Sequence, residues 1–87
     1  MTDYIVTFFS HFGAMRYKKE ADNAGLDAVL MPVPRYLSSS CGTCVKLRYA
    51  DGAADPNRFL PVPSHPDEIE MVVRMTGEET YIIVSKN

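Results

Sequence analysis

The chain has 87 residues, 46% of them hydrophobic and 23% charged, and its formal net charge is -2. A chain of this length holds one domain, expected to span residues 1–87, and the composition excludes a disordered chain, a collagen and a coiled coil. The acidic balance argues against binding to nucleic acid or to an anionic membrane surface. No apolar run approaches the roughly 20 residues of a membrane span, and no signal-peptide pattern precedes the first apolar run. We therefore expect a cytoplasmic protein.

The first predicted elements are a strand and a helix. Residues 4–9 are β-branched and aromatic, which predicts a strand, and both of its faces are apolar, which predicts a central one. Ser10 is the predicted N-cap of a helix over residues 11–24, and Gly25 is its predicted stop. The helix shows one stripe of small and apolar residues, formed by Ala14, Tyr17, Ala21 and Ala24.

Three further strands and a second helix are predicted after Gly25. The first of these strands covers residues 27–33, and its prolines favour an edge position. The next follows Cys44, where apolar and basic residues alternate up to Tyr49. A long Pro-rich connection leads to a second helix, which is predicted to begin at a capping box over 64–67 and to end at Gly77. The last strand is predicted over residues 80–84.

This element order predicts an α+β fold of the ferredoxin-like βαββαβ type, an antiparallel four-stranded sheet with two helices on one face. In an alternative arrangement, the last strand pairs with a second chain. In the ferredoxin-like sheet, strands one and two run parallel with strand three between them. The loop over residues 34–44 should therefore lie beside Ser10 and His11 at the start of the first helix.

This placement makes Cys41 the best nucleophile candidate in the chain. A helix N-terminus carries roughly half a positive charge, and Arg35 adds a full one, so a thiol in this setting tends to lose its proton. Gly42 leaves the backbone beside the thiol uncrowded for an approaching partner. The alternative is that Cys41 is an inert turn residue.

Four roles remain open for Cys44. It could be a resolving thiol for Cys41, half of a metal site, part of a sulfur relay, or a packed strand residue. The thioredoxin-type CxxC pair opens a helix, whereas this pair opens a strand. A zinc site needs four ligands, and only His11 and His65 could complete one, with His65 expected at the other end of the molecule. We therefore predict no metal and no cofactor.

The supporting residues also allow two interpretations each. His11 could orient or deprotonate Cys41, although a histidine at a helix start is more often solvated or part of the cap. Arg35 could hold an oxyanion or be a surface charge.

Several short motifs together indicate a family. They are Ser10–Met15 opening a helix, Gly25-Leu26, Pro32-Val33-Pro34-Arg35, a Ser-rich loop, and Cys41-Gly42. In these residues the chain resembles the putative selenium/sulfur carrier protein-like family of small bacterial and archaeal proteins. The resemblance implies that Cys41 carries sulfur or selenium as a persulfide or perselenide. Cys44 is additional to the usual single cysteine, and the connection over residues 51–63 is longer than expected.

Three functions follow from these observations. The favoured one is a carrier without cofactor, and not an enzyme in the sense of turnover. It would receive sulfur or selenium on Cys41 from a donor of the cysteine desulfurase type and pass it to an acceptor protein. The second is a binding or assembly module with structural cysteines, dimerising through the open sheet face. The third is a CxxC thiol-disulfide redox protein that uses Cys41 and Cys44.

Overall fold

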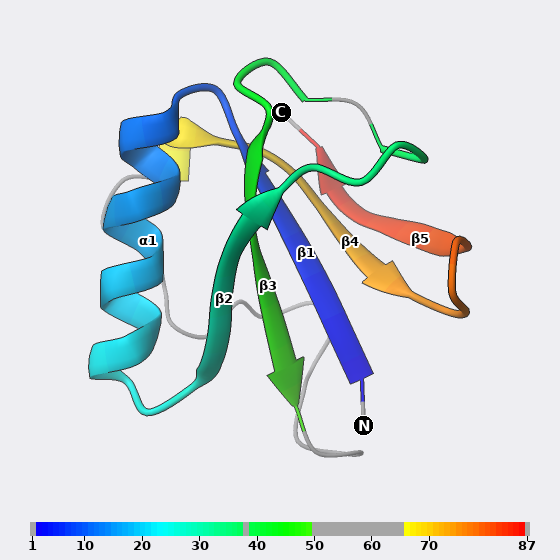
Figure 1. Cartoon of the computed structure of the whole chain (residues 1–87), viewed down its shortest axis with the longest axis horizontal. Coiled ribbons are helices and arrows are strands. Elements are labelled where there is room, and N and C mark those ends of the chain that lie inside the picture. Colours follow the sequence, from blue (N-terminus) through cyan, green and yellow to red (C-terminus); the bar gives the residue numbers. More distant parts are fainter. Residues whose placement is uncertain (1, 38, 50–65, 87) are drawn as a thin grey trace.

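The computed structural model describes residues 2–37, 39–49 and 66–86. The elements in chain order are β1 (Thr2–Phe8), α1 (His11–Asn23), β2 (Asp27–Pro32), β3 (Thr43–Tyr49), a 3-10 turn (Pro66–Glu68), β4 (Ile69–Met75) and β5 (Tyr81–Lys86). The five strands form one antiparallel sheet in the order β2-β3-β1-β4-β5. Figure 1 shows α1 beside the β2 side of this sheet, where it packs on β2, β3 and β1.

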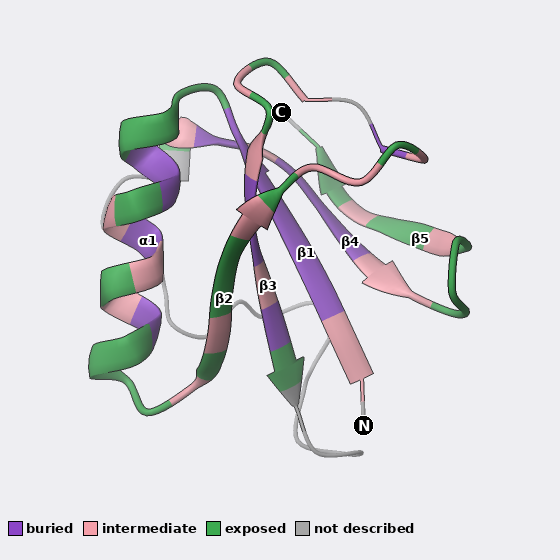
Figure 2. Cartoon of the chain, in the orientation of Figure 1, coloured by how far each residue is buried: buried purple, intermediate pink, exposed green. Residues whose placement is uncertain are grey.

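The prediction of a central first strand is confirmed. β1 lies between β3 and β4, and its residues from Tyr4 to Phe8 are all buried (Figure 2). β2 is an edge strand, as its prolines predict. Successive residues of β1 point to opposite faces of the sheet, so the strand contributes different side chains to the core on each face.

The predicted ends of the first helix are also confirmed. The Ser10 side chain accepts a hydrogen bond from the Gly13 amide at 3.1 Å, as an N-cap does. At the other end, Gly25 has a φ of +78°, and the Leu26 amide donates to the Ala21 carbonyl at 3.0 Å. This is a Schellman-type ending, which glycine favours because it has no Cβ.

The core has one layer on each face of the sheet. The helix-side cluster consists of Tyr4, Val6, Phe8, Ala14, Tyr17, Ala21, Val45, Leu47, Ile69 and Val72. The opposite cluster consists of Ile5, Leu37, Cys44, Met71 and Val73. Leu37 comes from the β2–β3 loop, so part of the face that was expected to be open is covered by the chain itself.

The predicted second helix is wrong over the described residues. Pro66–Glu68 form a 3-10 turn, and Ile69–Met75 form β4. The apolar residues of this segment fit helical spacing, but the adjacent Val72 and Val73 are both fully buried, one in each layer. A strand that is buried on both faces has no alternation to distinguish it from a buried helix.

The fold class is confirmed as α+β, but the four-stranded, two-helix description needs correction. Among the described residues there are five strands and one α-helix, and β5 extends the sheet beyond β4. β3 does lie between β1 and β2, as expected. The connection over 51–63 and the capping box at Ser64 lie outside the described residues. In the described part of the chain, no helix is long and apolar enough to cross a membrane.

Candidate functional site

The β2–β3 loop returns to the end of β1 and the start of α1 (Figure 1), as expected. Ser39 Oγ donates a hydrogen bond to the Phe8 carbonyl at 3.4 Å. His11 Nδ1 and Thr43 Oγ1 are hydrogen-bonded at 2.9 Å. Residues more than 30 positions apart in sequence therefore meet around the two cysteines.

Cys41 is a free, half-buried thiol at the end of this loop. It packs against the helix-side cluster, and its Sγ donates to the Thr43 carbonyl at 3.4 Å. The following residue, Gly42, has a φ of +76°, and a Cβ added there would meet nothing within 4 Å. The Gly42 carbonyl accepts from the Val33 amide at 3.0 Å, which fixes the turn. The backbone beside the thiol is therefore fixed in conformation but open to approach.

Cys44 is a free thiol in a different environment. It is fully buried, with Thr7 and Met31 as its neighbours on the adjacent strands, and it belongs to the cluster on the face opposite the helix. Its Sγ lies 3.8 Å from the Pro32 carbonyl. Burial, helped by the nearby Cys41, raises the pKa of the Cys44 thiol to about 11. The two cysteines thus pack into opposite layers of the core.

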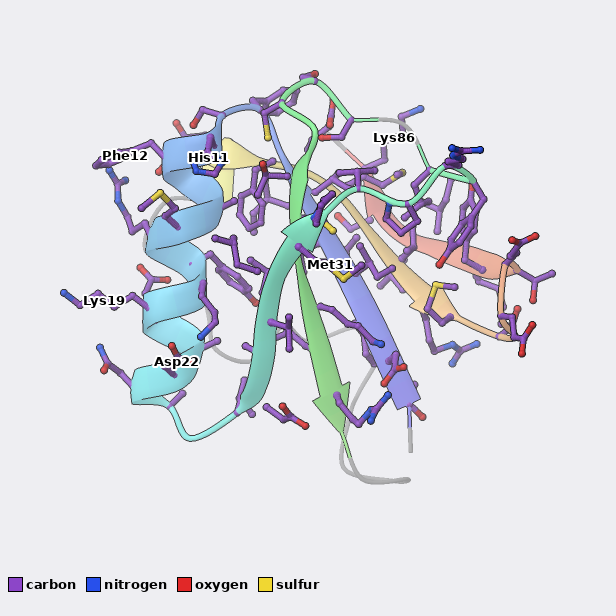
Figure 3. All side chains as sticks on the ribbon, viewed as in Figure 1. His11, Phe12, Lys19, Asp22, Met31 and Lys86 are labelled. Carbon is purple, nitrogen blue, oxygen red and sulfur yellow. The ribbon has the colours of Figure 1, made fainter. Side chains whose placement is uncertain are left out.

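Ser10 and His11 lie at the site, each with a partner. The Ser10 hydroxyl is used as the helix cap, and the exposed His11 bonds to Thr43 rather than to a cysteine. Figure 3 shows His11 on the first turn of α1. The residue after it, Phe12, extends away from the sheet. Thr43 therefore joins the site by its side chain to His11 and by its carbonyl to Cys41.

Arg35 is not brought to Cys41. It is exposed, and its neighbour Tyr36 packs on β4 and β5, with its ring 6.1 Å from that of Tyr81 and its hydroxyl 4.0 Å from Met75 Sδ. The β2–β3 loop extends toward β5 before it turns back to Ser39 (Figure 1). The positive charge expected beside the thiol therefore lies at the far end of the loop.

Sequence reasoning missed Glu70, because the segment was assigned to a helix. Glu70 accepts hydrogen bonds from the Ser40 amide at 3.1 Å and the Ser40 hydroxyl at 2.6 Å. Partial burial raises the pKa of this carboxyl, but hydrogen bonds from Ser40, Ser39 and Thr7 outweigh that effect, so the pKa lies below its usual value. Glu70 thus anchors the residues directly before Cys41 to β4.

Metal-ligating residues do not gather in the described part of the chain, where no three His, Cys, Asp or Glu side chains are placed to share an ion. His65, considered above as a ligand, lies outside the described residues.

A comparison with protein families identifies the chain's relatives. The family model described as "Putative Se/S carrier protein-like" matches residues 3–54. The chain belongs to this family. In this Se/S carrier protein-like chain, the matched region contains α1, β2, β3, both cysteines and all of β1 except Thr2. Comparison with curated proteins found no match, and neither did comparison with solved structures.

Proposed function

We propose that this member of the Se/S carrier protein-like family holds sulfur or selenium on Cys41 and passes it from a donor enzyme to an acceptor protein. The observation that carries the proposal is the contrast between the two thiols. Cys41 is half-buried beside the open Gly42 turn, whereas Cys44 is fully buried with a pKa of about 11. Because thiolates attack sulfur, a thiol this buried and this weakly acidic is a poor acceptor at neutral pH.

The loading step is a thiol exchange with no net oxidation. The Cys41 thiolate attacks the terminal sulfur of a persulfide on the donor, an enzyme of the cysteine desulfurase type. The S–S bond of the donor breaks, a new S–S bond forms on Cys41, and the donor cysteine leaves as a thiolate. A selenium donor would give the S–Se analogue by the same exchange.

The delivery step repeats this exchange in the opposite direction. A thiolate of the acceptor attacks the terminal atom on Cys41, takes it as its own persulfide, and restores the Cys41 thiolate. This cycle needs no cofactor, and we expect it in the reducing cytoplasm, where thiols stay free.

The residues around Cys41 have supporting roles in this proposal. The hydrogen bonds of Glu70 to Ser40 and of the Gly42 carbonyl to Val33 hold the loop on both sides of the thiol. The start of α1, with its partial positive charge, favours the anionic form of a loaded persulfide. His11 lies on that first turn and reaches Thr43.

The packing of the two cysteines in opposite layers argues against a role for Cys44 as resolving thiol. Its attack on a loaded Cys41 would release hydrogen sulfide and leave a Cys41–Cys44 disulfide. To reach Cys41, the Cys44 side chain would have to leave the cluster formed with Ile5 and Met71. Moving a buried side chain out of the core costs free energy, because its packing contacts are lost.

Intact mass spectrometry tests the proposal. The protein is incubated with cysteine and a purified cysteine desulfurase, with Cys41→Ser and Cys44→Ser run alongside. We expect a reductant-sensitive gain of one sulfur atom, about 32 Da, on the wild type and on Cys44→Ser but not on Cys41→Ser. A loss of two hydrogens that needs both cysteines would favour the redox function instead. An unmodified wild type whose Cys41 is alkylated slowly would favour the binding module.

A further inference from the structure

One side of α1 exposes two large apolar side chains. Phe12 is 65% exposed and Met15 is 49% exposed. Together with Arg16 and Lys19 they follow the i, i+3, i+4, i+7 spacing that aligns side chains along one side of a helix. Figure 3 shows Phe12 and Lys19 projecting from this side of α1, away from the sheet. We call Phe12, Met15, Arg16 and Lys19 the outer face of α1.

The aromatic ring of Phe12 is exposed but held in position. The Arg16 guanidinium lies 4.9 Å from the centroid of the ring, in a cation–π contact. Arg16 is held in turn by an ion pair with Glu68, with 2.5 Å between Arg16 Nη1 and Glu68 Oε1. Glu68 comes this close because residue 13 is a glycine, and a Cβ on Gly13 would lie 2.8 Å from Glu68 Oε2. An aromatic side chain that is already fixed loses little conformational freedom when a partner binds it.

The charges on this side of the molecule are basic, although the chain as a whole is acidic. Residues 11–19 contain three Lys and Arg residues and no Asp or Glu. Arg16 and Lys18 form ion pairs, whereas Lys19 forms none within the part of the chain that the structure describes. A carboxylate of a partner would therefore find a free cation here. A second copy docked through the same residues would bring further cations instead, so the charges favour an acidic partner over self-association.

The outer face of α1 begins next to the residues that surround Cys41. His11, which precedes Phe12, is hydrogen-bonded to Thr43 at 2.9 Å, and the Thr43 carbonyl accepts from Cys41 Sγ at 3.4 Å. Figure 1 shows the start of α1 and the β2–β3 loop at the same end of the molecule. A protein interface of ordinary size covers about 800 Å² on each partner. An enzyme that brings a persulfide to the half-buried Cys41 therefore also covers the start of α1.

We propose that the outer face of α1 is the docking surface for the sulfur donor, an enzyme of the cysteine desulfurase type that presents an apolar recess bordered by carboxylates. Phe12 and Met15 enter this recess, and Lys19 pairs with a carboxylate at its border. The proposal rests on the carrier function proposed for Cys41. It adds the surface by which the donor recognises the chain and the chemistry that the donor must present.

Loading kinetics with two sulfur donors test this surface. One donor is a purified cysteine desulfurase with cysteine, and the other is inorganic polysulfide, a small donor whose S–S bond the Cys41 thiolate cleaves without protein docking. We expect Phe12→Ala to lower the second-order rate of loading by the enzyme about tenfold and to leave loading by polysulfide unchanged. Ile83→Ala is the matched control, because Ile83 is 50% exposed on β5, and it should change neither rate. Circular dichroism checks that both variants are folded.

A charge reversal tests the part assigned to Lys19. Lys19→Glu should slow loading by the enzyme roughly fivefold at low salt, and the difference from the wild type should shrink as the salt concentration rises. Lys86→Glu, which reverses an exposed charge at the end of β5, is the control and should load at the wild-type rate.

The two donors separate failure of the docking surface from failure of the carrier function. Equal enzyme loading of Phe12→Ala and Ile83→Ala would overturn the docking surface alone, as would a Phe12→Ala variant that both donors load equally slowly. A wild type that only polysulfide loads would overturn the choice of donor. A wild type that neither donor loads would overturn the carrier function as well. Binding to phosphatidylserine vesicles that Phe12→Ala abolishes, with enzyme loading unchanged, would assign the outer face to a membrane instead.

Discussion

The two cysteines of the chain are separated by only two residues, yet they lie in two contrasting regions. Cys41 ends the β2–β3 loop, contacts the helix-side cluster and is half-buried. Cys44 is the second residue of β3, contacts the cluster on the other face and is fully buried. The turn at Gly42, with its positive φ, and the start of β3 separate the two environments. Spacing of the CxxC type therefore says little about whether two thiols can react with each other.

The largest expected effect of this contrast is on alkylation. At pH 7 a thiol with a pKa of about 11 has about 100-fold less thiolate than an ordinary thiol, and burial slows access further. Iodoacetamide should therefore modify Cys41 at least about tenfold faster than Cys44, because the greater nucleophilicity of a more basic thiolate offsets only part of the difference. Peptide mass mapping over time, with Cys41→Ser and Cys44→Ser as references, measures both rates. Similar rates would show that the two environments do not differ in solution.

The next effect is on stability at high pH. The Cys44 thiol ionises near 9 when unfolded and at about 11 in the folded chain, so between these values the unfolded state has lost a proton that the folded state keeps. Stability should therefore fall as pH rises from 9 to 11, by about 2–3 kcal/mol at most. Cys44→Ala lacks this titration, so urea unfolding of both proteins should show a steeper fall for the wild type. Parallel pH profiles would contradict the assignment.

A smaller effect separates the two glycines with positive φ. Gly42 and Gly25 have φ values of +76° and +78°, and an added Cβ meets nothing within 4 Å at either site. Gly42→Ala and Gly25→Ala should each destabilise the fold by about 1 kcal/mol. Only Gly42→Ala, which is next to the thiol, should also slow the loading of Cys41. Equal loading rates in the two variants would remove the Gly42 turn from the proposed mechanism.

The smallest predicted effect concerns Glu70. Glu70→Gln weakens the hydrogen bonds to Ser40 and should cost about 1 kcal/mol or less. Because the pKa of Glu70 is lowered on folding, the advantage of the wild type should be present above about pH 4.5 and disappear as pH falls through the folded pKa. Glu78→Gln, which removes an exposed carboxyl in the β4–β5 turn, is the matched control variant. Matching pH profiles for the two variants would argue against the role of Glu70 in anchoring Ser40 to β4.

Much of the first half of the fold could be predicted from the sequence, because local signals agree there. Ser10 and Gly25 mark the helix ends by their own capping chemistry, and the apolar run of β1 predicts a central strand. The meeting of the β2–β3 loop with the helix start followed from the strand order alone. The position of the helix and the order of three strands were thus enough to predict that Cys41 lies near the start of the helix.

The rest depended on information that periodicity does not contain. β4 is buried on both faces, so its pattern fits a helix as well as a strand, and Glu70 was consequently assigned to the wrong kind of element. Arg35 was expected near Cys41 because the two residues belong to the same loop. The packing of Tyr36 on Tyr81 instead draws that part of the loop away from Cys41. The buried cluster that contains Cys44 also includes Leu37, a loop residue with no periodic pattern.

The most direct test of the carrier role is the release of a loaded atom. The protein is loaded with labelled sulfur by a cysteine desulfurase, separated from the enzyme and given glutathione as acceptor, in wild-type and Cys44→Ser forms. We predict that one labelled atom per chain moves to glutathione and that both forms return to their original mass with their thiols free. Label that stays on the protein, or that leaves only as sulfide with formation of a Cys41–Cys44 disulfide, would contradict the account.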